Sequence, residues 1–218
     1  MKAQFEARNE AVWHYIATWG AGAAGLGLGY LVHPSLYVLG GLGIGLGLFT
    51  AYFFRDPARR ITSDPKAIVA PADGTIVGIE EIASSPYFDG PCKRVSIFLS
   101  VFNVHINRAP FDGVVASIQY RPGAFKNAMR ADTSDLNEAN TVYMTTAQGG
   151  MTVRQISGLI ARRIVCKVVP GEAVAKGEKF GMIKFGSRTE LYLPTNTEIC
   201  VKMKDKVEGG ASIVGRFP

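Results

Sequence analysis

The sequence predicts a mainly β (α+β) protein, in which an antiparallel β sandwich or distorted barrel is preceded by an N-terminal transmembrane helical hairpin. Two observations carry this prediction. Two long uncharged runs lie near the N-terminus, and the chain after residue 54 consists of short β-branched runs that glycine and proline interrupt. We therefore divide the chain into a membrane-anchoring hairpin, residues 1–55, and a folded domain, residues 56–218.

The hairpin is predicted from two runs without formal charge, Trp13 to Val32 and Leu36 to Phe54, with His14 taken as neutral. Each has about the 20 residues that a helix needs to cross a bilayer. A short turn containing Pro34 joins the runs without a signal-peptide cleavage site between them. A buried hairpin of a soluble protein is the alternative, but so many glycines would destabilise helices in water. Glycines at G-x-x-x-G spacing instead indicate helices packed closely in lipid: Gly25 and Gly29, Gly41 and Gly45, Gly43 and Gly47.

Basic residues flank the hairpin on both sides and predict its orientation. Positive residues stay on the cytoplasmic side, so both ends of the hairpin should face the cytoplasm. We expect a protein of the cell membrane whose domain lies on the cytoplasmic face, against anionic headgroups. This accounts for part of the net charge of +6 without a nucleic-acid partner. The flanking residues are Lys2 and Arg8, then Arg55, Arg59, Arg60 and Lys66.

Closely spaced apolar runs in the domain favour antiparallel strands. The polar stretch from Ala124 to Asn140 is the least strand-like, and we expect part of it to be helical and part a loop near a site. The predicted strands are Ile68–Val69, Thr75–Ile82, Arg94–Phe102, Val114–Tyr120, Thr141–Thr146, Met151–Ile156, Ile160–Val169, Lys179–Lys184, Glu190–Leu193, Glu198–Lys202 and Ser212–Val214.

Several kinds of site are not indicated. Three scattered cysteines without a C-x-x-C pair argue against a disulfide framework or a zinc site. No metal-ligand spacing or phosphate-binding loop occurs. Residues 20–25 match G-x-G-x-x-G, but no strand precedes them and no acidic residue follows at the required spacing. His105 is the one histidine outside the hairpin region.

Four motifs, in order, resemble those of phosphatidylserine decarboxylases, specifically the short form found in some bacteria and archaea. Together they extend over nearly the whole chain and are far more specific than any one alone. They are Phe53-Phe54-Arg55-Asp56-Pro57, Pro71-Ala72-Asp73-Gly74, Asn103-Val104-His105-Ile106-Asn107-Arg108-Ala109-Pro110, and Lys176-Gly177-Glu178 leading into Phe185-Gly186-Ser187.

The resemblance implies that the chain cuts itself between Gly186 and Ser187, although a Gly-Ser pair alone would indicate a turn. The products would be a large chain, 1–186, and a small chain, 187–218, which stay together as a heterodimer. Attack of the Ser187 hydroxyl on the Gly186 carbonyl gives an ester, and elimination and hydrolysis then leave a covalent pyruvoyl group at residue 187. This group is the implied cofactor, without a metal or pyridoxal phosphate.

The implied activity is decarboxylation of phosphatidylserine in an anionic membrane to phosphatidylethanolamine. The pyruvoyl group would form a Schiff base with the substrate amine and accept the electron pair released as carbon dioxide leaves. The sequence leaves open whether the protein also forms a homo-oligomer.

Three further residues receive roles from the resemblance. Asp73 is expected to act in self-cleavage by orienting or charging a proton acceptor, as in an acid-histidine-serine triad. His105 is expected to transfer protons during decarboxylation. Many family members carry a second histidine three positions later, where this chain has Arg108. An arginine cannot serve as a base, so Arg108 is a candidate for binding a carboxylate or phosphate, and the self-cleavage base is left open.

Weaker candidates and other functions remain. Arg121 and Arg130 are further candidates for contact with a lipid phosphate. The alternative function is a membrane-tethered biotinyl- or lipoyl-like carrier or binding module, because residues 170–178 resemble the glycine-turned hairpins of such domains. That reading leaves Asp73 and His105 without a role. Another pyruvoyl-dependent decarboxylase acting on a soluble amino acid is disfavoured by the two apolar runs.

Overall fold

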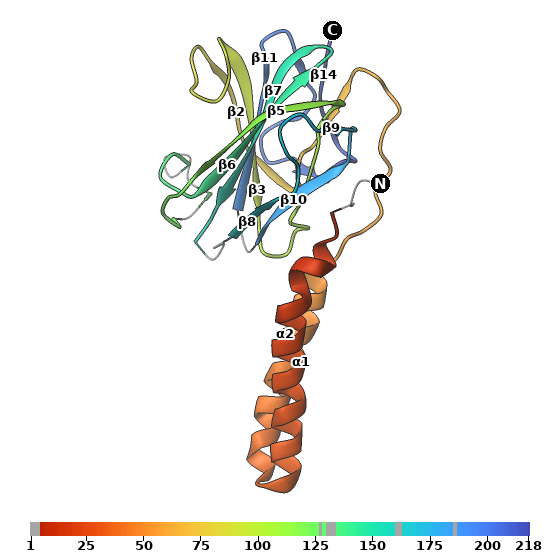
Figure 1. Cartoon of the computed structure of the whole chain (residues 1–218), viewed down its shortest axis with the longest axis vertical. Helices are drawn as coiled ribbons and strands as arrows, with labels where there is room; N and C mark the ends of the chain where they lie inside the picture. Colours follow the sequence, from red (N-terminus) through yellow and green to blue (C-terminus); the bar gives the residue numbers. More distant parts are fainter. Residues whose placement is uncertain (1–4, 127, 130–133, 160–162, 185–186) are drawn as a thin grey trace. The chain divides into compact units, whose positions relative to one another are not determined.

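The computed structural model describes residues 5–126, 128–129, 134–159, 163–184 and 187–218. Two compact units make up the chain: Glu6–Pro57 forms one, and Ala58–Pro218 forms the body of the other. Both predicted secondary-structure classes are present, since the first unit is helical and the second consists of strands (Figure 1). The mainly β fold class is confirmed.

The helical unit is an antiparallel pair of helices, α1 (Ala7–Leu31) and α2 (Tyr37–Phe53), joined by a 3-10 turn, η1 (Pro34–Leu36). Glycines bring the two backbones together, because a Cβ on Gly25 would collide with the backbone of Gly40. Gly41 and Gly45 face open space, so their predicted role in packing is wrong. Gly22 and Gly40 take part in the helix contact instead.

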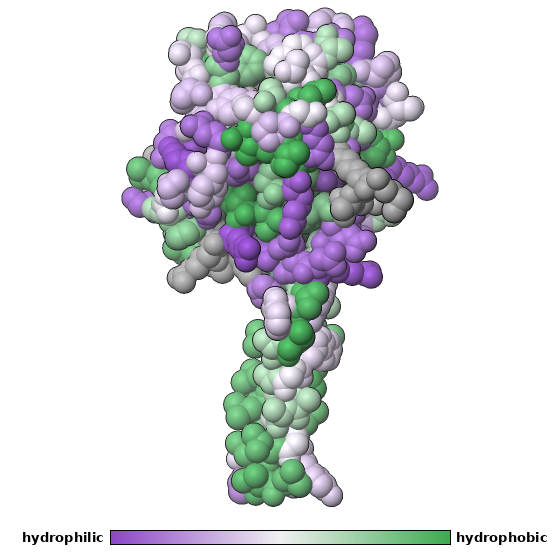
Figure 2. Space-filling model, viewed as in Figure 1, coloured by the Kyte–Doolittle hydropathy of each residue, from purple (hydrophilic) through white to green (hydrophobic). Residues whose placement is uncertain are grey.

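The face of this hairpin that Figure 2 shows is largely apolar. Within the described residues, Pro34–Phe53 is the one helical segment long and apolar enough to cross a membrane, with a hydropathy of 1.7. α1 is longer but less apolar, because it carries polar and aromatic residues among its alanines and glycines. An apolar helix suited to membrane anchoring is therefore present, and the anchor of two membrane spans stays a prediction.

The second unit is built around one large antiparallel sheet that curls on itself. Its eight strands follow the order β13-β2-β3-β11-β7-β6-β5-β9, and two sheets of three strands, β4-β10-β8 and β1-β14-β12, complete the unit. The strands of the large sheet are β13 (Lys206–Val207), β2 (Gly74–Ile82), β3 (Cys92–Leu99), β11 (Ser187–Pro194), β7 (Gly149–Ser157), β6 (Ala139–Thr146), β5 (Gly113–Arg121) and β9 (Ala173–Val174). The others are β4 (Ile106–Arg108), β10 (Lys179–Lys184), β8 (Arg163–Cys166), β1 (Ala67–Val69), β14 (Ile213–Arg216) and β12 (Glu198–Ile199).

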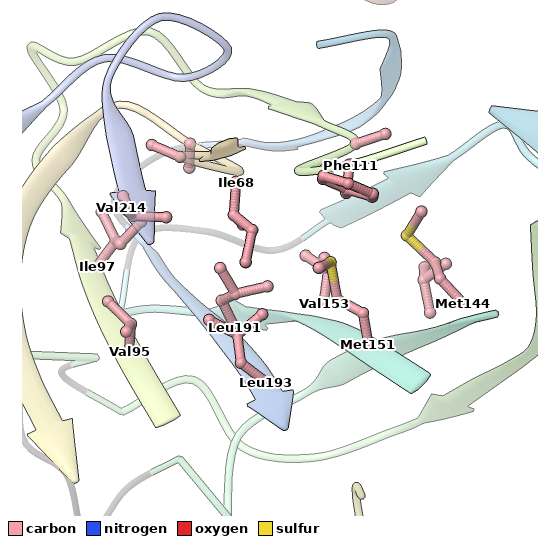
Figure 3. Close-up of a cluster of buried hydrophobic side chains, with 14 of the residues drawn as sticks. Ile68, Val95, Ile97, Phe111, Met144, Met151, Val153, Leu191, Leu193 and Val214 are labelled. Carbon is pink, nitrogen blue, oxygen red and sulfur yellow. The ribbon is translucent and has the colours of Figure 1, made fainter. Parts of the chain in front are cut away.

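The hydrophobic core lies on the concave face of the large sheet. Leu191 and Leu193 of β11 are fully buried there, next to Val153 of β7 and Val95 and Ile97 of β3 (Figure 3). Side chains of a strand alternate between its two faces, so Ser187 and Thr189 share this face with the two leucines. The central strand thus carries polar residues at its start and apolar residues at its end.

Local hydrogen bonds explain where the predicted strands were too long. β3 ends at Leu99 rather than Phe102, because the backbone N–H of Ser100 donates to Asn103 Oδ1 at 2.9 Å and turns the chain. β12 ends at Ile199, and the N–H of Lys202 donates to Asp205 Oδ2 in a following turn. β8 begins at Arg163, whereas residues 160–162 of the predicted strand lie outside the described residues.

The polar stretch 124–140 contains no helix in its described part. The side chain of Asn137 fixes it instead, because it accepts from the N–H of Lys126 and donates to the carbonyls of Lys126 and Ser157. Up to residue 138 the described part of this stretch is therefore a connector tied to the end of β7, and β6 begins at Ala139.

Candidate active site

Ser187 is the first residue of β11, the central strand of the large sheet. It pairs with Leu99 of β3 on one side and Ser157 of β7 on the other. Its side chain is fully buried, and among the described residues its Oγ has no hydrogen-bond partner. A buried hydroxyl without a partner is costly, so this position requires an explanation. Gly186 lies outside the described residues.

Asp73 is placed at the same end of the sheet as Ser187. It directly precedes β2, whose Thr75 pairs with Phe98, and Phe98 also pairs with Arg188. Gly74 is required at this point, because a Cβ would collide with the carbonyl oxygen of Phe98. The start of β2, the end of β3 and the start of β11 therefore lie in one row.

His105 is held to the segment that leads into Ser187. Its carbonyl accepts the N–H of Ile183, four residues before Ser187, at 3.2 Å. Its Nδ1 lies 2.9 Å from the carbonyl of Asn103, and the side chain is fully buried. The carbonyl holds a proton on Nδ1, which leaves Nε2 as the nitrogen able to exchange protons in the neutral ring.

Three of the sequence motifs contact one another around these residues. The N–H of Arg108 donates to the carbonyl of Pro71 at 2.9 Å, and the N–H of Ala109 donates to the carbonyl of Glu178 at 2.8 Å. The motifs around Asp73, His105 and Lys176 are thus neighbours, although more than 100 residues separate the first from the last.

Asp73 is engaged by partners that the sequence did not reveal. Its Oδ2 lies 2.7 Å from Arg59 Nη2, and its Oδ1 accepts the N–H of Gly209 at 2.8 Å. Burial raises the pKa of the Asp73 carboxyl, whereas the Gly209 N–H and the Arg59 guanidinium act in the opposite direction. Within the described part of the chain no contact joins Asp73 to His105, so the triad arrangement stays a prediction.

The arginine candidates are placed in different surroundings. Arg108 is buried and donates from Nη1 to the carbonyl of Gly177 at 3.0 Å. Arg121, at the end of β5, donates to the carbonyls of Ser134 and Asn137. Arg130 lies outside the described residues. Binding of a carboxylate or phosphate by Arg108 therefore stays a prediction.

A chain of buried polar side chains links the strand that follows His105 to the strand that begins with Ser187. Asn107 donates to Thr189 Oγ1 at 3.1 Å and accepts from Gln155 Nε2 at 2.8 Å. Asn140 donates in turn to Gln155 Oε1 at 2.9 Å. All four residues are buried. Each side chain in this series has its hydrogen-bond partner, so the series fixes β4 relative to β11. It thereby also positions His105 and Ser187, which lie two residues before Asn107 and Thr189.

The opposite face of β11 carries buried charges. Arg188 Nε lies 3.0 Å from Glu190 Oε1, and Arg188 also donates to Ser96 Oγ of β3 at 2.8 Å. Glu190 accepts from Tyr192 and lies 3.3 Å from Arg154 of β7. Burial lowers the pKa of the Arg188 guanidinium, and Glu190 acts in the opposite direction. These contacts anchor β11 to both neighbouring strands immediately after Ser187.

Comparison with known proteins decides the family. The phosphatidylserine decarboxylase family model matches residues 46–215. The chain belongs to the phosphatidylserine decarboxylase family. The match covers the motifs around Asp73, His105 and Ser187 that carried the resemblance.

Individual relatives extend this result. A phosphatidylserine decarboxylase proenzyme of Carboxydothermus hydrogenoformans is 45% identical over 191 residues, which cover 87% of this chain and 88% of the relative. A protein of the same name from Syntrophus aciditrophicus is 47% identical over 78% of this chain and 80% of the relative. The name proenzyme describes a precursor that is processed. The assignment to the short form within the phosphatidylserine decarboxylases stays a prediction.

The polar chain was missed by sequence analysis, although Asn107 lies inside a quoted motif. The available signal was Gln155, a polar residue in a predicted apolar strand, and its partners lie 48 and 15 residues away. Arg59 had been assigned only to the basic flank of the hairpin.

Thr189→Val should lower the thermal midpoint of this decarboxylase by about 2–10 °C, because it removes one acceptor at nearly constant volume and leaves the buried Asn107 amide with only the longer contact to the Pro71 carbonyl, at 3.5 Å. Thr189→Ser keeps the hydroxyl and should lose much less. Circular dichroism of both variants in detergent, each in a Ser187→Ala background, measures the difference. Equal midpoints for the two variants would show that the hydrogen bond does not hold β11.

Proposed function

We propose that this chain is a proenzyme that cuts itself between Gly186 and Ser187 and then decarboxylates phosphatidylserine. The observation that carries the proposal is the buried Ser187 hydroxyl at the start of the central strand, without a partner among the described residues. It stands in a family whose relatives bear the name proenzyme. The family match gives no support to the alternative of a biotinyl- or lipoyl-like carrier.

Self-cleavage begins when Ser187 Oγ attacks the carbonyl carbon of Gly186. The C–N bond breaks, and the acyl group moves to oxygen as an ester. Loss of the α-proton of residue 187 then expels the Gly186 carboxylate and leaves a carbon–carbon double bond. Water adds to its imine tautomer and releases ammonia. A weak hydroxyl nucleophile needs a base that takes up its proton.

The surroundings of Ser187 fit a pyruvoyl group. The position is buried, and the polar chain through Thr189 and the Arg188 contacts hold the strand from its first residues. When present, this group supplies an electrophilic carbonyl that binds the substrate amine and takes up the electrons released as carbon dioxide leaves. The proposal includes neither a metal nor pyridoxal phosphate.

We assign the remaining roles from position. His105, held through Nδ1 and through its own carbonyl, presents Nε2 for proton transfer in decarboxylation. Asp73 supports self-cleavage by charge, in a pair with Arg59. Arg108 remains the candidate for an anionic group of the substrate, with its guanidinium held by the Gly177 carbonyl.

The substrate and its location follow from the family and the anchor. Relatives named phosphatidylserine decarboxylase act on a phospholipid, and the apolar Pro34–Phe53 segment suits a membrane. We place the domain on the cytoplasmic face of the cell membrane, in accord with the basic flanks of the hairpin. The large and small chains form a heterodimer, and any homo-oligomer would be additional.

Ser187→Ala removes the attacking hydroxyl and should leave one uncut chain without decarboxylase activity. Intact mass spectrometry of the purified wild type should show two fragments, residues 1–186 and 187–218, with the smaller one blocked to Edman degradation. One full-length species in the wild type would contradict the proposal.

His105→Ala should leave self-cleavage intact and reduce the rate of decarboxylation by about 10²–10⁴-fold, the contribution of general acid–base catalysis. Mass spectrometry follows the cut, and release of labelled carbon dioxide follows the reaction. His33→Ala, in the hairpin turn, is the matched control and should retain both activities. If the His105→Ala chain stayed uncut, the role of His105 would lie in maturation rather than in decarboxylation.

Vesicles that contain phosphatidylserine should release carbon dioxide with the wild type, whereas free serine should not. The reason is that the proposal assigns recognition to the lipid headgroup at a membrane. Release from free serine at a comparable kcat/KM would favour a decarboxylase of soluble amino acids.

A further inference from the structure

The connectors near the start of β11 expose an unusual number of large apolar side chains. Ser187, Leu99 and Ser157 lie in one row, so the connectors that follow β3 and β7 emerge beside Ser187. The β5–β6 connector joins them, because Asn137 binds the carbonyl of Ser157. The exposed apolar residues of these three connectors are Phe102, Phe125, Met129, Leu136 and Leu159.

The opposite end of the large sheet differs. The connectors that flank β3, β7 and β11 at that end are residues 83–91, 147–148 and 195–197, and none of them contributes a large apolar side chain to the exposed set of the described residues. Phe102 is 64% exposed and Leu159 is 67% exposed. Large apolar side chains that are exposed together at one end of a domain point to an interaction site, in contrast to the scattered exposure of ordinary surfaces.

Basic side chains accompany the apolar ones. Lys126 is exposed next to Phe125, and Arg163 is exposed at the start of β8. Among the described residues of these connectors, the exposed acid Asp135 is engaged by Arg154 and by the hydroxyl of Tyr87. The described residues at this end of the sheet therefore combine exposed apolar side chains with the exposed positive charges of Lys126 and Arg163, the chemistry that binds an anionic bilayer.

We infer that Phe102, Phe125 and Leu159, together with Lys126 and Arg163, form a docking rim that seats the domain on an anionic lipid bilayer at the end of the sheet where β11 begins with Ser187. This inference rests on the proposed function. The acyl chains of a phospholipid stay in the bilayer while its headgroup must reach residue 187, which is fully buried. A rim that enters the bilayer–water interface at this end of the domain shortens the path of the headgroup from the bilayer to residue 187. The substrate then reaches the protein without crossing bulk water.

The double variant Phe102→Ser/Leu159→Ser tests the rim, and Val169→Ser is its matched control. Val169 is 59% exposed, and its connector lies beside Val115 of β5, away from the start of β11. Full-length protein is placed in vesicles and given either phosphatidylserine in the bilayer or monomeric dihexanoyl-phosphatidylserine in solution. The double variant should lose about 10-fold or more in kcat/KM on the bilayer substrate and stay within about 2-fold on the soluble one. Val169→Ser should match the wild type on both.

The outcomes separate the two proposals. The rim would be overturned if the double variant turned over the bilayer substrate as fast as the wild type, or if it lost equal activity on both substrates. It would also be overturned if the double variant changed its oligomeric state and kept its turnover. A wild type that converts neither substrate would instead overturn the proposed function. Intact mass spectrometry verifies that the variants still cut themselves.

Charge and depth provide two further measurements. Lys126→Glu/Arg163→Glu should reduce turnover on vesicles with phosphatidylglycerol by about 5-fold or more, and about 0.5 M salt should bring wild type and variant together. A tryptophan introduced as Phe102→Trp, in a Trp13→Phe/Trp19→Phe background, should be quenched by brominated lipids, whereas Val169→Trp should not. Equal quenching at the two positions would contradict insertion of the rim.

Discussion

The pairing of β11 between β3 and β7 is the interaction on which the rest of the structure depends. The ladder begins at Ser187 itself and continues for eight residues along β3 and six along β7. A strand end in solution frays, but this one is bordered on both sides from its first residue. The residue proposed to become a chain terminus is thus held by backbone hydrogen bonds that do not need the peptide bond to Gly186.

The two faces of β11 contribute in different ways. Thr189 meets the neutral chain of Asn107 and Gln155, whereas Arg188 meets Ser96 and Glu190 on the other side. Neutral hydrogen bonds set the distance between two strands at little electrostatic cost. A buried ion pair contributes little net stability. A shift in register that separated its two charges would nevertheless be strongly destabilising, because each charge would then be buried without a partner. The combination specifies one position for residue 187.

Much of this arrangement could be predicted from local sequence. The apolar alternation located β2, β5, β7 and β10, and the motif resemblance singled out Ser187 and His105, whose roles stay predictions. β4 was missed because three residues, Ile106–Arg108, carry too little periodicity to be separated from the preceding apolar run. The partners of Asp73 were missed because Arg59 and Gly209 are brought to it by tertiary folding from opposite ends of the domain. Gln155 was missed for the same reason, since its polarity is explained only by Asn107 and Asn140.

The segment after Ser187 contributes strands to more than one sheet. β11 and β13 belong to the large sheet, and β12 and β14 belong to the small sheet that also contains β1. Such interleaving arises readily while the polypeptide is continuous, because all strands then meet within one molecule. Once the chain is cut, reassembly after denaturation requires two separate molecules to find each other at low concentration. Maturation would therefore make unfolding irreversible, because folding comes before the cut. Heat inactivation of the mature protein would then be governed by the rate of unfolding rather than by a folding equilibrium.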